Sequence, residues 1–210
     1  MEKTLFCIRH GYALHNKLFW TIGRKAYGEF RDTPLLLEGY NQAKELNKTW
    51  KDINDVELVV ISPCTRTMET AKFIFRDVNV AMISEDFLIE YPVGGYEICN
   101  QRKDLDHLKF AYPTVSFEQK NNEMVWGENE ETKEELDERI NAMLKWIGKR
   151  KEKTIAIVSH SSYIGRMKDR IIGDEKNELH HCYPYKLMVN YDDNGDFKTL
   201  KEVNNCYEND

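Results

Sequence analysis

The chain has 210 residues, of which 41% are hydrophobic and 31% charged, and this length fits one domain or one domain with an insertion. The composition excludes a disordered chain, a fibre and a membrane-spanning protein. The formal net charge of −6 argues against a nucleic-acid-binding protein, which is more often basic, so a local cluster of basic residues must hold any anionic ligand.

Three short apolar runs predict strands that are buried on both faces. They cover residues 5–8, 58–61 and 155–158. Each run is continuous rather than alternating, as is typical of a parallel sheet. Helical patterns of apolar residues follow Gly39 and Arg66, and the clearest spans residues 136–147 with charges on its other face. This order predicts an α/β fold with an open, mostly parallel sheet and helices on both faces.

Two regions depart from this alternation. Residues 84–135 contain prolines, glycines and isolated aromatics, and we interpret them as an insertion over one edge of the sheet, with a short helix near residues 105–110. Nine acidic residues lie between positions 118 and 138, and the simplest interpretation is a solvated loop followed by the acid-rich first turn of a helix. Near the C-terminus, two apolar runs flank Asp193-Asn194-Gly195 and predict a β-hairpin. We therefore expect one domain over residues 1–210.

The cysteines and the N-terminus indicate the compartment. The five cysteines are widely spaced and contain no Cys-x-x-Cys pair, so neither a zinc ribbon nor a complete disulfide framework is expected. The apolar stretch at the N-terminus is interrupted by Arg9 and His10, too early for a secretion signal. We therefore expect a cytoplasmic location.

Unusual polar residues follow each of the three predicted strands. Arg9 and His10 come directly after the first strand, Arg66 lies shortly after the second, and His160 lies just after the third. The carboxyl ends of parallel strands face a common crevice in an open α/β sheet, so these four side chains should converge there. The N-termini of the helices that follow also favour an anion. The sequence therefore predicts an anion pocket, with phosphate as the obvious anion and a candidate nucleophile inside it.

The order and spacing of these residues resemble the histidine phosphatase superfamily, with its phosphoglycerate-mutase-like fold, over nearly the whole chain. The resemblance rests on Arg9-His10-Gly11 with Asn16, Asp32-Thr33-Pro34-Leu35 with Gly39, Ser62-Pro63 with Arg66-Thr67, and Ser159-His160. The middle of the chain is also similar to the branch of small fungal and plant broad-specificity phosphatases. That similarity is carried by Leu88-Ile89-Glu90, Cys99-Asn100, Arg102, Tyr112-Pro113 and Trp126.

The resemblance implies a role for each matching residue. His10 is expected to be the nucleophile that becomes phosphohistidine, and Glu90 the proton donor to the leaving group. The residues expected to hold the phosphate are Arg9, Asn16, Arg66, His160, Ser161 and Arg102. Glu97, which follows two glycines on the same loop as Glu90, is the rival proton donor.

Together these features predict a metal-independent phosphomonoester phosphatase of the histidine acid phosphatase type. Phosphoryl transfer needs positive charge around three oxygens, and two arginines with a protonated His160 would supply it without a metal or cofactor. Water would then attack the phosphohistidine with Glu90 as general base. The expected partner is a small phosphorylated substrate, and neither its identity nor the oligomeric state is predicted.

Two alternative functions stay open, and one pair of histidines needs an interpretation. A phosphoglycerate mutase would need extra basic residues around its mouth, where residues 118–138 are acidic. A binding module of the same fold would have no use for a nucleophile. The pair His180-His181 lacks an acidic partner at ligand spacing, and we interpret it as a structural turn before the hairpin rather than a metal site.

Overall fold

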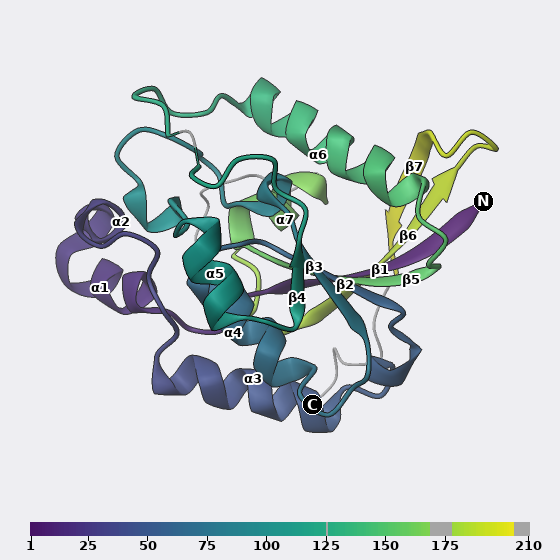
Figure 1. Ribbon diagram of the computed structural model, residues 1–210, viewed down its shortest axis with the longest axis horizontal. Helices are drawn as coiled ribbons and strands as arrows, with labels where there is room; N and C mark the ends of the chain where they lie inside the picture. The colour runs from purple at the N-terminus through teal and green to yellow at the C-terminus, as the bar shows by residue number, and fades with distance from the viewer. Residues whose placement is uncertain (125, 169–177, 204–210) are drawn as a thin grey trace.

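The computed structural model describes residues 1–124, 126–168 and 178–203, and within them its centre is a seven-stranded sheet (Figure 1). The strands are β1 (Glu2–Arg9), β2 (Leu58–Ile61), β3 (Ala81–Ser84), β4 (Val115–Phe117), β5 (Thr154–Ser159), β6 (Pro184–Tyr191) and β7 (Phe197–Glu202). They lie in the order β4-β3-β2-β5-β1-β6-β7, and only β6 and β7 run antiparallel to their neighbours. The predicted open, mostly parallel sheet and the C-terminal hairpin are therefore confirmed.

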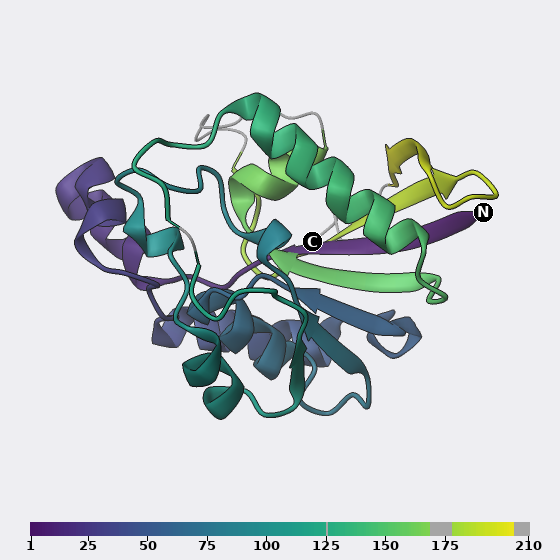
Figure 2. The ribbon, with the colours of Figure 1, turned by 45° about the horizontal axis from the view of Figure 1, so that its top comes forward.

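Helices cover both faces of the sheet, as Figures 1 and 2 show. One face carries α3 (Leu37–Thr49) and α4 (Thr65–Ile74), and the other carries α6 (Lys133–Gly148) and α7 (Ser161–Met167). Successive side chains of a strand point to opposite faces, so each central strand contributes to two cores. Leu5 and Ile155 pack with the α6 side, whereas Phe6 and Ala156 pack with the α3 side. Burial on both faces is the reason why these strands are continuously apolar.

The start of α6 explains the acidic residues that precede and open this helix. Thr132 caps the helix, because its hydroxyl accepts a hydrogen bond from the Glu135 amide at 3.2 Å and the Glu135 carboxylate accepts one from the Thr132 amide at 2.7 Å. Glu134 and Glu135 also lie in the first turn, where the helix dipole favours negative charge. Glu131 forms an ion pair with Arg139 at 2.7 Å, so part of this acidic segment is bound within the fold.

Residues 84–135 contain the expected short helix, α5 (Leu105–Ala111), and add β4 as the edge strand beside β3. Two further helices, α1 (Leu14–Ile22) and α2 (Ala26–Glu29), were not predicted. They lie beyond the carboxyl end of β1, at the left of Figures 1 and 2. Only His15 of α1 is buried, whereas its apolar residues Leu14, Leu18 and Phe19 are half-buried.

Two glycines hold the loop after β1 against the first turn of α3. A Cβ atom on Gly11 would lie 2.6 Å from the carbonyl oxygen of Gly39, and one on Gly39 would collide with the carbonyl oxygen of Tyr12. The Leu36 amide donates a hydrogen bond of 3.0 Å to that same Tyr12 oxygen. Because no side chain fits between the two backbones, the residues next to Gly11 have a fixed position relative to α3.

The cysteines that the structure describes, at positions 7, 64, 99 and 182, are free and buried, while Cys206 lies outside the described residues. Within the described part of the chain, no helix has both the length and the apolar character that crossing a membrane requires.

Candidate active site

Four imidazole rings meet at the carboxyl end of β1. His10 is 2% exposed, and the centroid of its ring lies 5.3 Å from that of His160, 5.5 Å from that of His15 and 5.6 Å from that of His181. His160 follows β5, His15 lies on α1, and His181 precedes β6. Residues from three distant parts of the chain therefore share one buried site at the carboxyl end of the parallel strands.

The backbone determines which nitrogen of His10 is available. Its Nδ1 lies 2.7 Å from the carbonyl oxygen of Gly11, which can only accept a hydrogen bond, so Nδ1 carries the proton and Nε2 keeps its lone pair. Burial, and then the neighbouring Arg66 and imidazoles, hold the pKa of His10 well below its usual value. The free protein thus presents a neutral imidazole with one unprotonated nitrogen, which is the form that acts as a nucleophile.

Arg66 is 1% exposed and reaches this site from the first turn of α4. Its two terminal nitrogens donate to the Cys99 carbonyl oxygen at 2.7 Å and to Asn100 Oδ1 at 2.8 Å. Its Nε is buried and has no hydrogen-bond partner among the described residues. A buried donor without a partner costs free energy, so Arg66 is prepared to bind an acceptor that enters the site.

Arg9 is held in a similar way, although by another part of the chain. It is 4% exposed, and its terminal nitrogens donate to the carbonyl oxygen of Leu179 and to Glu178 Oε1, each at 2.6 Å. Within the described residues its Nε is also buried without a partner. The two arginines therefore have their terminal groups fixed by the protein and an unpaired N–H each, a combination that suits an anion.

His160 donates or accepts one hydrogen bond and leaves one nitrogen unpaired. Its Nε2 lies 2.8 Å from Ser62 Oγ, and its Nδ1 is buried with no partner among the described residues. Burial and then Arg66 lower the pKa of His160 well below its usual value. The protonated His160 that we expected from the sequence is therefore disfavoured in the empty site, although an anion bound between it and Arg66 would favour the protonated form.

Glu90 lies at the N-terminus of α7, where three backbone amides bind its carboxylate. The donors are Tyr91 at 2.8 Å, Tyr163 at 2.9 Å and Ser162 at 3.1 Å. Burial raises the pKa of Glu90, while these amides and the charge of Arg66 oppose the shift. Burial thus favours the protonated form of Glu90, and the amides with Arg66 favour the carboxylate. A group that gives up and takes back a proton needs both forms.

Glu97, the rival proton donor, has a different partner. Its Oε1 accepts a hydrogen bond from Arg24 at 2.9 Å, and the Arg24 side chain is 77% exposed. Burial raises the pKa of Glu97 as well, whereas Arg24 lowers it. The charge of Arg66 lowers the pKa of Glu90, whereas the exposed Arg24 lowers the pKa of Glu97. Glu90 is therefore favoured as the carboxyl group nearer to the anion site.

The structure gives Arg102 a role different from the phosphate binding that we expected. All five of its N–H donors are used: two bind the Asp86 carboxylate at 2.7 and 3.1 Å, and three bind the carbonyl oxygens of Lys103, Asn121 and Asn122. The side chain is fully buried in this arrangement. With no donor left for a ligand, Arg102 stabilises the region around α5 instead of binding phosphate.

Asn16 and Ser161 make local contacts. Asn16 Oδ1 accepts a hydrogen bond from the Ala13 amide at 3.0 Å and caps α1, and Ser161 Oγ accepts one from the Leu179 amide at 3.2 Å. Ser161 therefore supports the segment that binds Arg9. The amide nitrogen of Asn16 and the hydroxyl proton of Ser161 stay candidates for phosphate binding.

His181 is a site residue that sequence reasoning missed. Its Nδ1 donates to the carbonyl oxygen of His10 at 2.6 Å, and its ring stands perpendicular to that of Tyr12 at 5.7 Å. The next amide, of Cys182, donates to the carbonyl oxygen of Arg9 at 2.9 Å. The turn before β6 thus binds the backbone of Arg9 and His10. Only the pairing of β6 with β1 could have revealed these contacts.

We expect acidification to destabilise the free protein through these buried imidazoles. Burial, and then Arg9, lower the pKa of His181 to about 3, against about 6.5 in an unfolded chain. Between these values the unfolded state binds more protons, so the free energy of unfolding falls as pH falls, by up to about 1.4 kcal/mol per pH unit for one such group. The melting temperature should therefore fall from pH 7 to pH 5, and less steeply in His181→Asn.

The matched control is His107→Asn, because His107 is exposed on α5. This variant should keep the pH dependence of the wild type. Identical slopes for His181→Asn and the wild type would contradict the assignment of a buried neutral imidazole at position 181.

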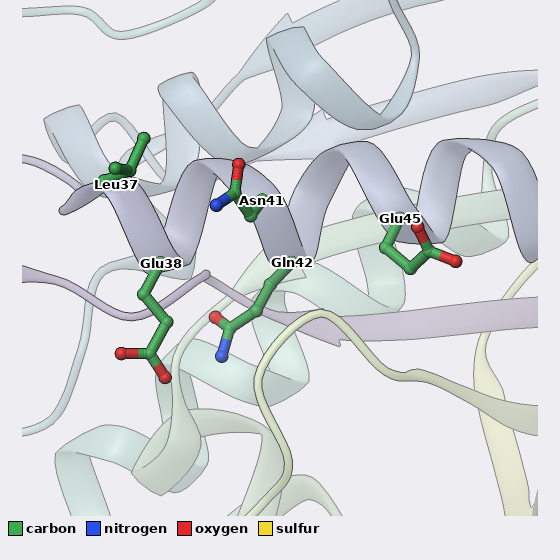
Figure 3. Close-up of a pocket in the computed structure, with 5 residues that line it drawn as sticks. All are labelled: Leu37, Glu38, Asn41, Gln42 and Glu45. Atoms are coloured by element: carbon green, nitrogen blue, oxygen red, sulfur yellow. The ribbon is translucent and has the colours of Figure 1, made fainter.

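A hollow along the outer side of α3 is a separate feature. It has a volume of about 640 Å³ and is lined by Leu37, Glu38, Asn41, Gln42 and Glu45, with Glu38 and Gln42 on the same side of the helix (Figure 3). Two of these five side chains are acidic and none is basic, so the hollow does not suit a phosphate. Within the described residues, no group of three or more His, Cys, Asp or Glu side chains is arranged to hold a metal ion.

Comparison with known proteins agrees with this geometry. The model of the histidine phosphatase superfamily (branch 1) matches residues 5–204. The chain is 29% identical over 201 residues to phosphoglycerate mutase-like protein 1 of Arabidopsis thaliana, which covers 77% of this chain and 69% of the relative.

Solved structures share the fold at low sequence identity. The alpha-ribazole phosphatase from Shigella flexneri aligns with a TM-score of 0.60 and 20% identity, over 96% of each chain. The ecdysone phosphate phosphatase of Bombix mori, solved in complex with tungstate, aligns with a TM-score of 0.61 and 14% identity, over 97% of this chain and 92% of the other.

Proposed function

The chain belongs to the histidine phosphatase superfamily, and we propose that it is a metal-independent phosphomonoesterase that works through a phosphohistidine at His10. One observation carries the proposal: the unprotonated Nε2 of a buried, neutral His10 shares its site with the unpaired Nε donors of Arg9 and Arg66. A nucleophile beside unpaired donors for an anion is the arrangement that attack on a phosphoryl group requires.

In the first step, His10 Nε2 attacks the phosphorus of the substrate. An N–P bond forms, the P–O bond to the alcohol breaks, and the alcohol oxygen takes the proton of Glu90. Arg9, Arg66 and His160 bind the three equatorial oxygens, whose negative charge they stabilise through the transition state. The raised pKa of Glu90 in the buried site makes its protonated form available for this step.

In the second step, water replaces the histidine. Glu90, now a carboxylate, takes a proton from the water as its oxygen attacks phosphorus, and the N–P bond breaks to regenerate neutral His10. The Nδ1–H bond to Gly11 keeps the imidazole in one orientation through both steps. His181 holds the His10 backbone and so positions the nucleophile without contacting the phosphoryl group.

A mutase would retain the phosphohistidine and rebind a second phosphate-bearing molecule. The acidic segment of residues 118–138, of which Glu130 lines a cavity beside the site, opposes this because it adds negative charge where a mutase needs basic residues. Phosphatase activity is therefore the function that the site supports best. Release of inorganic phosphate from p-nitrophenyl phosphate in the presence of EDTA tests it. Activity that requires an added divalent metal would contradict it.

Replacement of Glu90 by glutamine should slow the hydrolysis of an alkyl phosphate about a hundredfold or more, in the range of general acid catalysis. An alkoxide is a poor leaving group and needs its proton in the transition state. p-Nitrophenolate leaves readily without one, so that substrate should slow much less. Comparing kcat for the two substrates measures the difference.

Glu97→Gln is the matched variant for this comparison, because Glu97 lies on the same loop and is also partly buried. It should leave the ratio of the two rates near that of the wild type. Equal slowing of both substrates by Glu90→Gln, or a selective effect of Glu97→Gln, would assign the proton to another group.

A further inference from the structure

A second cavity, of about 360 Å³, opens beside the candidate active site. It is lined by Arg24, Lys25, Tyr27 and Gly28 from the α1–α2 segment, by Tyr96 and Glu97 from the loop after Glu90, and by Glu130. Its volume lies at the lower end of the range of small-ligand pockets, about 300–1,000 Å³. It therefore has room for one small organic group.

Tyr27 connects this cavity to the catalytic group. The centroid of its ring lies 5.9 Å from that of His15, whose ring lies 5.5 Å from that of His10. The Tyr27 ring also stacks on Phe19, which lies one turn after His15 on α1, at 5.6 Å with 22° between the planes. The tyrosine ring is thus packed against α1 beside the imidazole cluster, so it is fixed before any ligand arrives.

The cavity borders the loop that carries Glu90, the proposed proton donor to the leaving oxygen, because Tyr96 and Glu97 of that loop line it. Burial, and then the carboxylates around it, among them Glu97 and Glu90, raise the pKa of Tyr27 to about 12. Glu90 also acts on the pKa of Glu97, which lines the cavity. Since Glu90 gives its proton to the leaving oxygen, the group attached to that oxygen points toward these residues. The segment with α1 and α2 covers this end of the sheet (Figures 1 and 2).

The lining of the cavity defines the chemistry of an occupant. The rings of Tyr27 and Tyr96 offer flat apolar surfaces, and Tyr96 is 86% exposed with no packing role that would account for it. The charges of the lining balance, because Arg24 is bound to Glu97 and the remaining Lys25 and Glu130 are of opposite sign. The lining therefore selects for no charge, and its two tyrosine rings favour an occupant with a ring.

We propose that this cavity binds the leaving group of the substrate and selects phosphomonoesters whose alcohol carries a ring. The inference rests on the proposed phosphatase function and narrows its substrate class. It makes Tyr27 and Tyr96 residues that determine specificity, with no part in the transfer of the phosphoryl group.

The experiment compares two primary alkyl phosphates, so that the intrinsic reactivity of the leaving group stays similar. Ethyl phosphate has no ring, and benzyl phosphate has one. We expect kcat/KM for benzyl phosphate to exceed that for ethyl phosphate by about tenfold or more, as one well-bound group in a pocket provides.

Variants then assign the preference to the cavity. Tyr96→Ala should reduce the ratio of benzyl to ethyl phosphate severalfold, and because Tyr96 is exposed this variant should fold normally. Tyr27→Phe should keep the preference for a ring, whereas Tyr27→Ala should lose it. The matched control is Phe110→Ala, since Phe110 is 89% exposed on α5 and does not line the cavity.

Failure of this inference differs from failure of the proposed function. Equal kcat/KM for benzyl and ethyl phosphate in an enzyme whose activity depends on His10 would overturn the cavity proposal alone. Absence of hydrolysis for every substrate would overturn the phosphatase proposal. In that case, binding of benzylphosphonate and ethylphosphonate, measured by calorimetry, still decides on the cavity. Equal affinities, or a preference unchanged by Tyr96→Ala, would overturn it.

Discussion

Replacement of His10 by alanine should lower kcat on p-nitrophenyl phosphate by about four orders of magnitude or more, because the attacking atom is lost and residual catalysis comes only from binding. Label from a ³²P-substrate should be trapped on the wild-type protein as an acid-labile, base-stable phosphoramidate. The same label should be absent from His10→Ala. The reason is structural: His10 Nε2 keeps its lone pair in the buried site, since Nδ1 donates to Gly11.

The control for this measurement is His107→Ala, which removes an exposed imidazole on α5. It should label and turn over like the wild type. Equal labelling of His10→Ala would show that another of the clustered histidines, His15, His160 or His181, carries the phosphoryl group. Melting curves with and without tungstate would establish that the variant is folded.

Loss of Arg66 should have the second largest effect. Arg66→Ala should lower kcat by about 10²–10³, the cost of removing one fixed donor to a developing negative charge. Tungstate should bind this variant far more weakly than the wild type. Arg66→Lys should restore little, because an ammonium group cannot keep the bonds to Cys99 and Asn100 while it also presents an N–H to the anion.

Arg76→Ala provides the comparison, since the Arg76 side chain is 53% exposed and pairs with Asp77. It should leave both kcat and tungstate affinity unchanged. A normal kcat in Arg66→Ala, or full rescue by Arg66→Lys, would mean that Arg66 supports the loop around Cys99 without binding the phosphoryl group.

The central strands could be predicted, whereas β3 and β4 could not, for a physical reason. β1, β2 and β5 are buried on both faces, so their residues form continuous apolar runs. β3 begins with an exposed Ala81 and a half-buried Met82, and none of the three residues of β4 is fully buried. Without a buried face along its whole length, a short strand leaves no pattern in the sequence.

The same distinction holds for the site. Arg9, His10, Arg66 and His160 could be anticipated because each follows a predictable strand within a few residues. His181 could not, because its contact with His10 depends on how β6 pairs with β1. For Arg102, the family resemblance implied phosphate binding. A buried arginine serves an ion pair or a ligand equally well, and the sequence does not reveal Asp86 as its partner.

The order of the strands also has a consequence for how the protein folds. β5 is inserted between β1 and β2, so that Leu5 and Leu58 both pair with Ile155, and the pairing of β1 with β5 closes a loop of about 150 residues. Contacts over such a sequence separation form late, because the entropy of closing the loop must be overcome first. The residues at the ends of these three strands come together only when the last of them is inserted. A nascent chain that has not yet emerged as far as β5 therefore has no anion site, and the ability to bind one arises together with the completed sheet.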